Sequence, residues 1–252
     1  MSSYLSGNYS VLTDKGRVRK VNEDSAQCAV NAFGNVLLVI ADGMGGATKG
    51  DVASSKLVEH LIKTFRNLEE EFKNAKVAMK WLNKVIEEAN AKIFKIAESD
   101  PSFKGMGTTL VMAVFFKDNI YIANIGDSRC YVLDQDKITQ LTRDQTYVEY
   151  LAAHNKISED EKLTSKDRHA LMNFVGKNKT IDYEFKIVKN ERKVVLLCSD
   201  GLYNNASEKQ IFSALNSEER LDQKISTLIG IAKANGGTDN IAVSLWEPYK
   251  ND

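Results

Sequence analysis

Four aspartates of this 252-residue chain occupy the same kind of position, next to a short apolar run that is typical of a β-strand. Asp42, Asp127 and Asp200 each follow such a run and stand beside a glycine. The fourth, Asp239, precedes a run and lies close to a glycine pair. Carboxylates that converge at one rim of a sheet repel one another unless cations neutralise them. Hard divalent ions with oxygen ligands are the natural occupants, so the pattern predicts a site for such ions.

A single Asp-Gly pair is explained more simply as a turn. Repetition of the arrangement beside several apolar runs is what favours a metal site. A zinc site has little support, because the chain has only three scattered histidines, His60, His154 and His169, and catalytic zinc is held largely by nitrogen ligands.

The stretch Gly43-Met44-Gly45-Gly46 follows Asp42 directly. Glycine-rich turns ahead of a helix can bind phosphate through backbone N–H groups. A P-loop would continue with Gly-Lys-Ser/Thr, whereas this chain continues Ala47-Thr48-Lys49-Gly50. The glycines instead favour a close approach of the backbone to an ion, with the Gly43 carbonyl free to act as a ligand.

Arg19, Glu23 and Asp24 form a short charged cluster near the start of the chain. A solvated turn is the simpler interpretation of this segment alone. In the functional interpretation, Arg19 binds phosphoryl oxygens with paired donors. Glu23 and Asp24 then face the metal ions and orient their waters.

The elements that must position these residues follow from the hydrophobic pattern. Short apolar runs predict buried strands at residues 36–40, 110–116, 120–125, 130–133, 194–198 and 241–246. Helical periodicity predicts helices at residues 51–67, 75–98, 207–215 and 221–234. Strands, then a helical pair, then more strands favour a layered α+β protein over a doubly wound sheet. No linker interrupts the chain, so we expect one domain over residues 1–252.

The composition narrows the class of protein. Lys plus Arg and Asp plus Glu both number 34, so net charge gives no argument for nucleic acid or a membrane surface as a partner. The three cysteines, Cys28, Cys130 and Cys198, are few and widely spaced, which disfavours a disulfide framework. No signal-like or membrane-spanning run is found in the sequence. We therefore expect a cytoplasmic protein.

Seven short motifs, taken in order, resemble those of the metal-dependent protein phosphatase family, the type 2C Ser/Thr phosphatases, and especially its compact bacterial members. They are Arg19-x-x-Asn22-Glu23-Asp24, Asp42-Gly43-Met44-Gly45-Gly46, Gly107-Thr108-Thr109, Gly126-Asp127-Ser128-Arg129, Leu141-Thr142-Arg143-Asp144, Ser199-Asp200-Gly201-Leu202 and Asp239-Asn240. Each motif alone is weak, but their order and spacing over nearly the whole chain make the resemblance strong.

The resemblance implies a four-layer αββα fold, a central antiparallel β-sandwich flanked by helices on both faces, with a flap subdomain at about residues 143–179. It implies two core Mn²⁺ or Mg²⁺ ions bridged by Asp42. Asp200 and Asp239 complete the first ion, and the Gly43 carbonyl serves the second. Asp127, together with Asp200, holds a weaker third ion.

The implied activity is hydrolysis of phosphoserine and phosphothreonine esters by direct attack of a metal-bridging hydroxide. Arg19 binds the substrate phosphate, and Glu23 and Asp24 act through coordinated waters. The implied partners are phosphorylated proteins and an opposing Ser/Thr kinase. We expect a monomer without a nucleic-acid or membrane partner.

Two regions depart from the family pattern. Met44 stands where many eukaryotic members have a histidine that is a proposed general acid, so we expect a water to protonate the leaving group. The flap reads Asp144-Gln145-Thr146 where Asp-His-Ser is common, which leaves substrate preference open. We expect His154 and His169, both in the flap, at the surface.

Two alternatives stay open at this point. A pseudophosphatase would keep the fold as a regulatory binding module, and loss of Asp42, Asp200 or Asp239 would mark it; all three are present. A metal hydrolase of the same fold could act on small phosphoesters instead of proteins.

Overall fold

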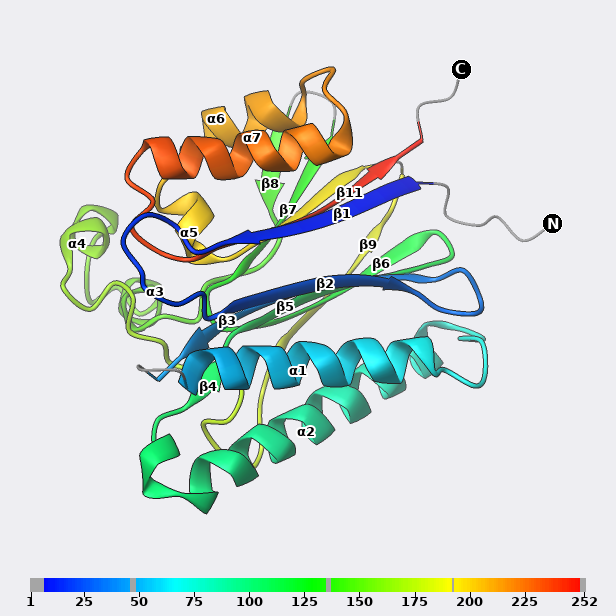
Figure 1. Cartoon of the computed structure of the whole chain (residues 1–252), viewed down its shortest axis with the longest axis horizontal. Coiled ribbons are helices and arrows are strands. Elements are labelled where there is room, and N and C mark those ends of the chain that lie inside the picture. The colour runs from blue at the N-terminus through cyan, green and yellow to red at the C-terminus, as the bar shows by residue number, and fades with distance from the viewer. Residues whose placement is uncertain (1–6, 46–48, 135–136, 192, 250–252) are drawn as a thin grey trace.

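Two antiparallel sheets stack face to face, and helices cover both outer faces (Figure 1). The computed structural model describes residues 7–45, 49–134, 137–191 and 193–249. Gly46 of the glycine-rich stretch therefore lies outside the described residues. The arrangement is the αββα sandwich that the sequence predicts, and the expected fold class is confirmed.

One sheet contains five strands in the order β1-β11-β10-β7-β8. Their bounds are β1 Gly7–Asp14, β7 Arg129–Asp134, β8 Lys137–Gln140, β10 Val194–Cys198 and β11 Ile241–Pro248. Three helices lie on its outer side: α5 Asp200–Tyr203, α6 Glu208–Leu215 and α7 Leu221–Ala234. Leu228 of α7 and Val243 of β11 belong to the apolar cluster between these layers.

The second sheet has the order β2-β3-β5-β6-β9, with a short strand β4 beside β3. Its strands are β2 Asp24–Val30, β3 Val36–Met44, β4 Gly107–Thr108, β5 Leu110–Phe116, β6 Asn119–Ile125 and β9 Glu184–Lys189. Two long helices cover it, α1 Lys49–Arg66 and α2 Ala75–Ser99, and a 3₁₀ turn, η1 Pro101–Phe103, follows. In the described parts of the chain, no helix combines the length and the apolar character needed to cross a bilayer.

The central strand β3 shows why continuous apolar runs predict this fold. Leu38 and Ile40 belong to the cluster between the two sheets, whereas Leu37 and Val39 belong to the cluster under α1 and α2. Successive side chains of a strand point to opposite faces, so a strand buried on both faces must be apolar throughout. Each fully buried aliphatic side chain contributes roughly 2 kcal/mol.

All six predicted strands and all four predicted helices are present, and β5 and β6 form an antiparallel hairpin. The hydrophobic pattern does not predict β1, β2, β8 and β9. These four strands lie at the edges of the two sheets, and their burial is partial. An edge strand needs no continuous apolar run, and for this reason the hydrophobic pattern does not predict these four strands.

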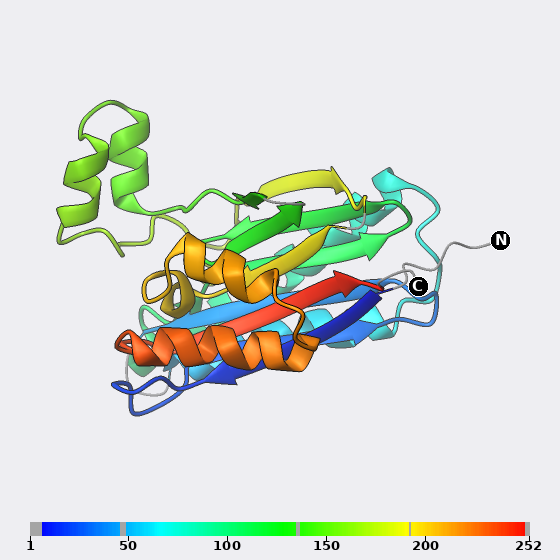
Figure 2. The same ribbon diagram turned by 90° about the horizontal axis from the view of Figure 1, so that it is seen from above.

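The chain between β8 and β9 leaves the sandwich and carries two short helices, α3 Tyr147–Ala153 and α4 Glu159–Thr164. Figure 2 shows both helices projecting from one end of the sheets. Thr146 accepts a hydrogen bond from the Glu149 N–H at the start of α3, and Ser158 forms a capping box with Glu161 at the start of α4. The segment coincides with residues 143–179, where the flap is expected.

Candidate active site

The predicted acidic residues come from both sheets and meet at one end of the sandwich. Asp24 begins β2 and is the register partner of Asp42 in β3. Asp127 lies in the turn between β6 and β7, and Asp200 begins α5 directly after β10. Asp239 lies just before β11. Figure 1 shows α5 and the connection between β1 and β2 at this same end.

The carboxylates raise one another's pKa. Burial, followed by the charge of Asp200, raises the pKa of Asp127 to about 8. Burial and the charges of Asp200 and Asp239 raise the pKa of Asp24 to about 8, although hydrogen bonding with Ser199 and with the Asp42 carboxyl group opposes the rise. The pKa of Asp42 lies well above its usual range through burial and the charge of Asp24, followed by those of three further aspartates. Burial and the charge of Asp239 raise the pKa of Asp200 to about 6.

The raised pKa values indicate whether these residues suit a divalent cation. A group of carboxylates that destabilise one another's charge gains most from a bound cation. Asp24 Oδ1 is buried and has no hydrogen-bond partner among the described residues, so one carboxylate oxygen is free to interact with an ion or with its water. Oxygen donors are also the set that Mg²⁺ and Mn²⁺ prefer. The residues therefore fit hard divalent ions.

The carboxylates affect one another electrostatically, but they do not form a closed coordination shell. Within the described ranges, no three His, Cys, Asp or Glu side chains are grouped closely enough to hold an ion. Binding of one ion by several carboxylates requires rotation about their χ angles toward a common point.

Arg19 extends from the connection between β1 and β2 to the carboxylates. Its Nη2 donates to Asp239 Oδ2 at 2.6 Å. That hydrogen bond raises the pKa of Arg19, and the charges of Asp239, Asp200 and Asp42 add to the effect. The Arg19 side chain is 51% exposed, so its guanidinium lies at the surface of the acidic group.

Asn240 holds the connection that carries Arg19. Its side-chain amide donates to the carbonyls of Lys15 and Val21, both at 2.9 Å, and its Oδ1 accepts from the Glu23 N–H at 2.8 Å. Since Asn240 follows Asp239 in sequence, one short segment supplies a carboxylate and fixes the loop of the arginine. From the sequence, Asn240 is recognised only as part of the motif Asp239-Asn240.

Glu23 has a structural role that its sequence context does not predict. Its Oε1 accepts from the Gly50 N–H at 3.1 Å in the first turn of α1, where backbone donors are unpaired. Its carbonyl accepts from Gly43 N–H at 3.1 Å and Ser54 Oγ at 2.6 Å. Glu23 thus joins β2, β3 and α1 beside the carboxylates.

Gly43 is required for packing as well as for access to its carbonyl. A Cβ at this position would lie 2.1 Å from the Gly50 carbonyl oxygen and 2.6 Å from that of Glu23. Only glycine allows α1 to begin so close to β3.

Hydroxyl groups position Asp42 and Asp24. Thr109 Oγ1 accepts from the Asp42 N–H, and Thr108 Oγ1 donates to the Asp42 carbonyl, both at 2.9 Å. Ser199 Oγ donates to Asp24 Oδ2 at 2.7 Å and accepts from the Ala242 N–H at 2.8 Å. The sequence signal for these residues is their place in the motifs Gly107-Thr108-Thr109 and Ser199-Asp200.

Comparison with known proteins identifies the family of this chain. Residues 15–245 match the family described as Protein phosphatase 2C. The chain belongs to this family. The Listeria welshimeri serine/threonine phosphatase stp is 36% identical over 236 residues, which are 93% of each chain. The predicted resemblance is therefore confirmed.

Solved structures of family members agree with the fold. The Staphylococcus aureus serine/threonine phosphatase Stp1 is 30% identical, with a TM-score of 0.91 over 99% of this chain and 98% of that one. The catalytic domain of the phosphatase PstP, solved in complex with two manganese ions, is 30% identical. Its TM-score is 0.83 over 96% of this chain and 97% of that one. The chain is a type 2C protein phosphatase.

In this phosphatase, the root of the projecting segment is bonded to the turn that carries Asp127. Arg129 donates to both carboxylate oxygens of Asp144 and stacks 3.5 Å from the centre of the Tyr203 ring. The Tyr203 hydroxyl donates to the Asp127 carbonyl at 3.1 Å. Gln145, at the position where the family commonly has histidine, accepts from Gly126 N–H at 3.1 Å.

The structure refines the expectation for the two flap histidines. His169 is partly exposed, but its Nδ1 lies 3.8 Å from Asp200 Oδ2. It therefore lies at the rim of the acidic group and not on a remote surface. His154, which follows the end of α3, instead lies against Tyr150, with 4.2 Å between the ring centres and an angle of 39° between the ring planes.

Proposed function

We propose that this protein hydrolyses phosphoserine and phosphothreonine esters of proteins in a reaction that requires bound divalent ions. The observation that carries the proposal is the group of buried carboxylates whose pKa values are raised by burial and by one another. A guanidinium faces the same group. The names of the relatives support a serine or threonine ester as the substrate.

The ions are proposed to be Mn²⁺ or Mg²⁺, two in the core and a weaker third. Asp42 would be common to both core ions, Asp200 and Asp239 would hold the first, and the Gly43 carbonyl would serve the second. Asp127, together with Asp200, would hold the third. When bound, such ions lower the pKa of the attacking water and neutralise phosphoryl charge. The two manganese ions of the PstP structure support the choice of metal.

Arg19 is proposed to bind the substrate phosphate. Its partly exposed guanidinium can offer two parallel donors to phosphoryl oxygens, and its bond to Asp239 keeps it at the rim of the acidic group. Asp24 and Glu23 orient waters around the ions. Asp24 is held for this role by Ser199, while Glu23 uses Oε1 on the start of α1.

Direct attack by water agrees with the environment of the cysteines. Burial raises the pKa of Cys198 to about 12 and that of Cys130 above its ordinary value. A thiol is nucleophilic as the thiolate, so these two residues are poor candidates for a covalent phosphoenzyme. Met44 has no proton to donate, and we propose that water protonates the leaving oxygen.

We also propose partners, a location and a domain organisation for the enzyme. The substrates are phosphorylated proteins, an opposing Ser/Thr kinase supplies them, and the enzyme acts as a cytoplasmic monomer. The chain is one domain over residues 1–252, and residues 143–179 act as its flap. The bonds from Arg129 and Gln145 to the flap root support a flap whose position depends on the turn of Asp127.

The decisive assay measures phosphate release from a phosphothreonine peptide with and without Mn²⁺. Asp42→Asn and Asp239→Asn should abolish the metal-dependent turnover. Asp118→Asn, in the exposed turn of the β5–β6 hairpin, is the matched control and should leave it unchanged. A parent protein without metal-dependent turnover would support the pseudophosphatase alternative. Turnover of p-nitrophenyl phosphate but of no phosphoprotein would support the small-ester alternative.

A further inference from the structure

The two sides of the sandwich differ in how their edge strands are protected against pairing with a further strand. β9 carries Lys186 and Lys189, and β8 is only four residues long and carries Lys137. Lysines and short length are common protection against pairing with another strand. β1 and β2 lie on the opposite side of the molecule (Figure 2). They are eight and seven residues long and contain neither lysine nor proline.

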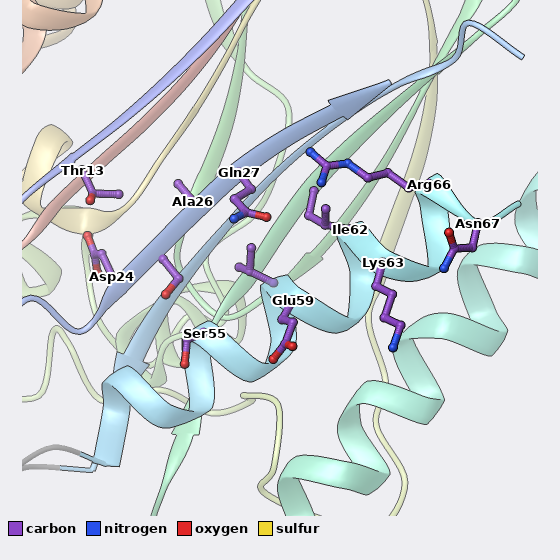
Figure 3. Close-up of a pocket in the computed structure, with 12 residues that line it drawn as sticks. Thr13, Asp24, Ala26, Gln27, Ser55, Glu59, Ile62, Lys63, Arg66 and Asn67 are labelled. Carbon is purple, nitrogen blue, oxygen red and sulfur yellow. The ribbon is translucent and has the colours of Figure 1, made fainter. Parts of the chain in front are cut away.

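A groove with a volume of about 660 Å³ follows the unprotected edge of β2. It lies between this strand and α1, with Asp24 at one end and Arg66 and Asn67 at the other (Figure 3). Val58 and Ile62 add apolar surface to its wall. The groove therefore leads from the candidate active site along the side of the sandwich.

The backbone of β2 can accept a further strand from the groove. β2 pairs only with β3 in the described sheet. For residues 25–30, no other backbone hydrogen bond to a described residue is found. The outward N–H and C=O groups of such a strand can pair with an extended peptide, and the neighbouring side chains then select its sequence.

The end of the groove away from Asp24 is positively charged. Lys63 and Arg66 line it from the last turn of α1, and neither forms an ion pair with an acidic side chain in the described ranges. Glu59, also on this wall, is paired with Lys56 at 3.4 Å. The charge of Arg66 acts on Cys28, which places this cation beside the middle of β2.

We propose that this groove binds an extended, acidic segment of a protein substrate as an added strand on β2, with its carboxylates facing Lys63 and Arg66. The proposal rests on the proposed phosphatase function, because Asp24 belongs both to the groove and to the candidate active site. From Asp24 to Cys28 the strand spans about 13 Å, at ~3.3 Å per residue. Acidic residues about four positions from the phosphorylated residue would thus be recognised.

Lys63 and Arg66 also lie where cations stabilise the C-terminus of a helix. That role accounts for their presence in the last turn of α1, but not for the groove or for the unprotected edge of β2. An experiment must therefore separate peptide binding from helix stability.

Hydrogen exchange of the full chain measures peptide binding without any need for turnover. The probe is a capped ten-residue peptide that alternates threonine and glutamate, and the comparison peptide has lysine in place of glutamate. We expect the acidic peptide alone to slow exchange of amides in residues 25–30. Equal protection by both peptides, protection confined to other strands, or no protection at millimolar peptide would overturn the proposal.

Reversing the charges of Lys63 and Arg66 provides a second test of the proposal. Lys63→Glu with Arg66→Glu should weaken binding of the acidic peptide about tenfold, or ~1.4 kcal/mol. Lys76→Glu with Lys80→Glu makes the same charge change on exposed positions of α2 and should have no effect. Thermal unfolding of both variants reports any loss of helix stability. Equal weakening in the two pairs would contradict a specific site.

Steady-state kinetics test whether the groove contributes to catalysis. A phosphothreonine peptide with a glutamate tail should show a raised KM in the Lys63→Glu, Arg66→Glu protein, with kcat unchanged. The KM for p-nitrophenyl phosphate, which is too small to reach the cations, should stay the same. Peptide binding without any turnover would leave the groove intact and contradict only the proposed function.

Discussion

Asp24 lies directly opposite Asp42 in the register of β2 and β3. Directly opposed residues of an antiparallel pair have Cβ atoms about 5 Å apart, so the pairing of two strands forces two carboxylates together. The charge of Asp24 is accordingly the largest electrostatic contribution, after burial, to the raised pKa of Asp42. The fold thus maintains a repulsion that a bound cation would relieve.

Asp24→Asn should stabilise the protein measured in EDTA and weaken its catalysis. The amide keeps an oxygen to accept from Ser199 but removes one charge from the buried group. We expect the free energy of unfolding at pH 8 to rise by about 1 kcal/mol, within the usual range for single substitutions. Urea denaturation and Mn²⁺-dependent kcat are the two measurements. A fall in stability in EDTA would contradict the described repulsion.

In EDTA, the free energy of unfolding should fall as the pH rises from about 4 to about 8. The folded pKa values of Asp24 and Asp127 are raised to about 8, so the folded state retains protons that the unfolded state has released above pH 3.8. A folded state that binds more protons loses stability as pH rises. Each retained proton costs about 1.4 kcal/mol of stability per pH unit, so we expect a loss of several kcal/mol between pH 5 and pH 8.

Saturating Mn²⁺ should reverse that loss at pH 8, because the cation favours the charged carboxylates and binds the folded state preferentially. Denaturation curves at both pH values, with EDTA or Mn²⁺, provide the test. Asp118→Asn should behave like the parent protein. Stability that rises with pH in EDTA would contradict the assigned pKa shifts.

Arg19→Lys should lower kcat/KM for a phosphopeptide by roughly 10- to 100-fold, since lysine keeps the charge but loses the paired donors. Mn²⁺ affinity should change little, because lysine keeps the positive charge beside Asp239. Steady-state kinetics and calorimetric titration of Mn²⁺ separate the two effects. Parallel losses of metal affinity and turnover would instead assign Arg19 to support of the metal site.

Gly43→Ala should destabilise the protein by about 3 kcal/mol or more, a value typical of severe backbone overlap. The new methyl group would meet the Gly50 carbonyl oxygen at 2.1 Å. Gly230→Ala is the matched control, because its Cβ has no neighbour within 4 Å in α7. Alanine there should stabilise the helix by roughly 0.5–1 kcal/mol. Thermal unfolding of both variants checks the contrast.

The sequence predicts the interior of this fold far better than its edges. The run from Val36 to Ile40 is apolar throughout because both faces of β3 are covered. β2 has only a partly buried pattern, and the hydrophobic pattern does not predict it. Consequently, the opposition of Asp24 and Asp42 follows from strand pairing alone, which no local pattern shows.

The residues of the candidate site also differ in how far the sequence predicts them. Strand-end aspartates can be recognised from local sequence, and the motif order assigns them to one family. The bond from Ser199 to Asp24 joins residues 175 positions apart, and His169 reaches Asp200 from a segment that leaves the sandwich. These contacts depend on how the two sheets and the projecting segment are stacked, so they could not be predicted from the sequence.

We propose that the buried carboxylates hold catalytic divalent ions, with Asp42 shared between two of them. Electron paramagnetic resonance of free Mn²⁺ during titration of the protein counts the bound ions directly. We expect at least two bound ions per chain in the parent protein and in Asp118→Asn, and loss of both tight sites in Asp42→Asn. Unchanged Mn²⁺ binding in Asp42→Asn, or no tight binding in the parent protein, would contradict this proposal.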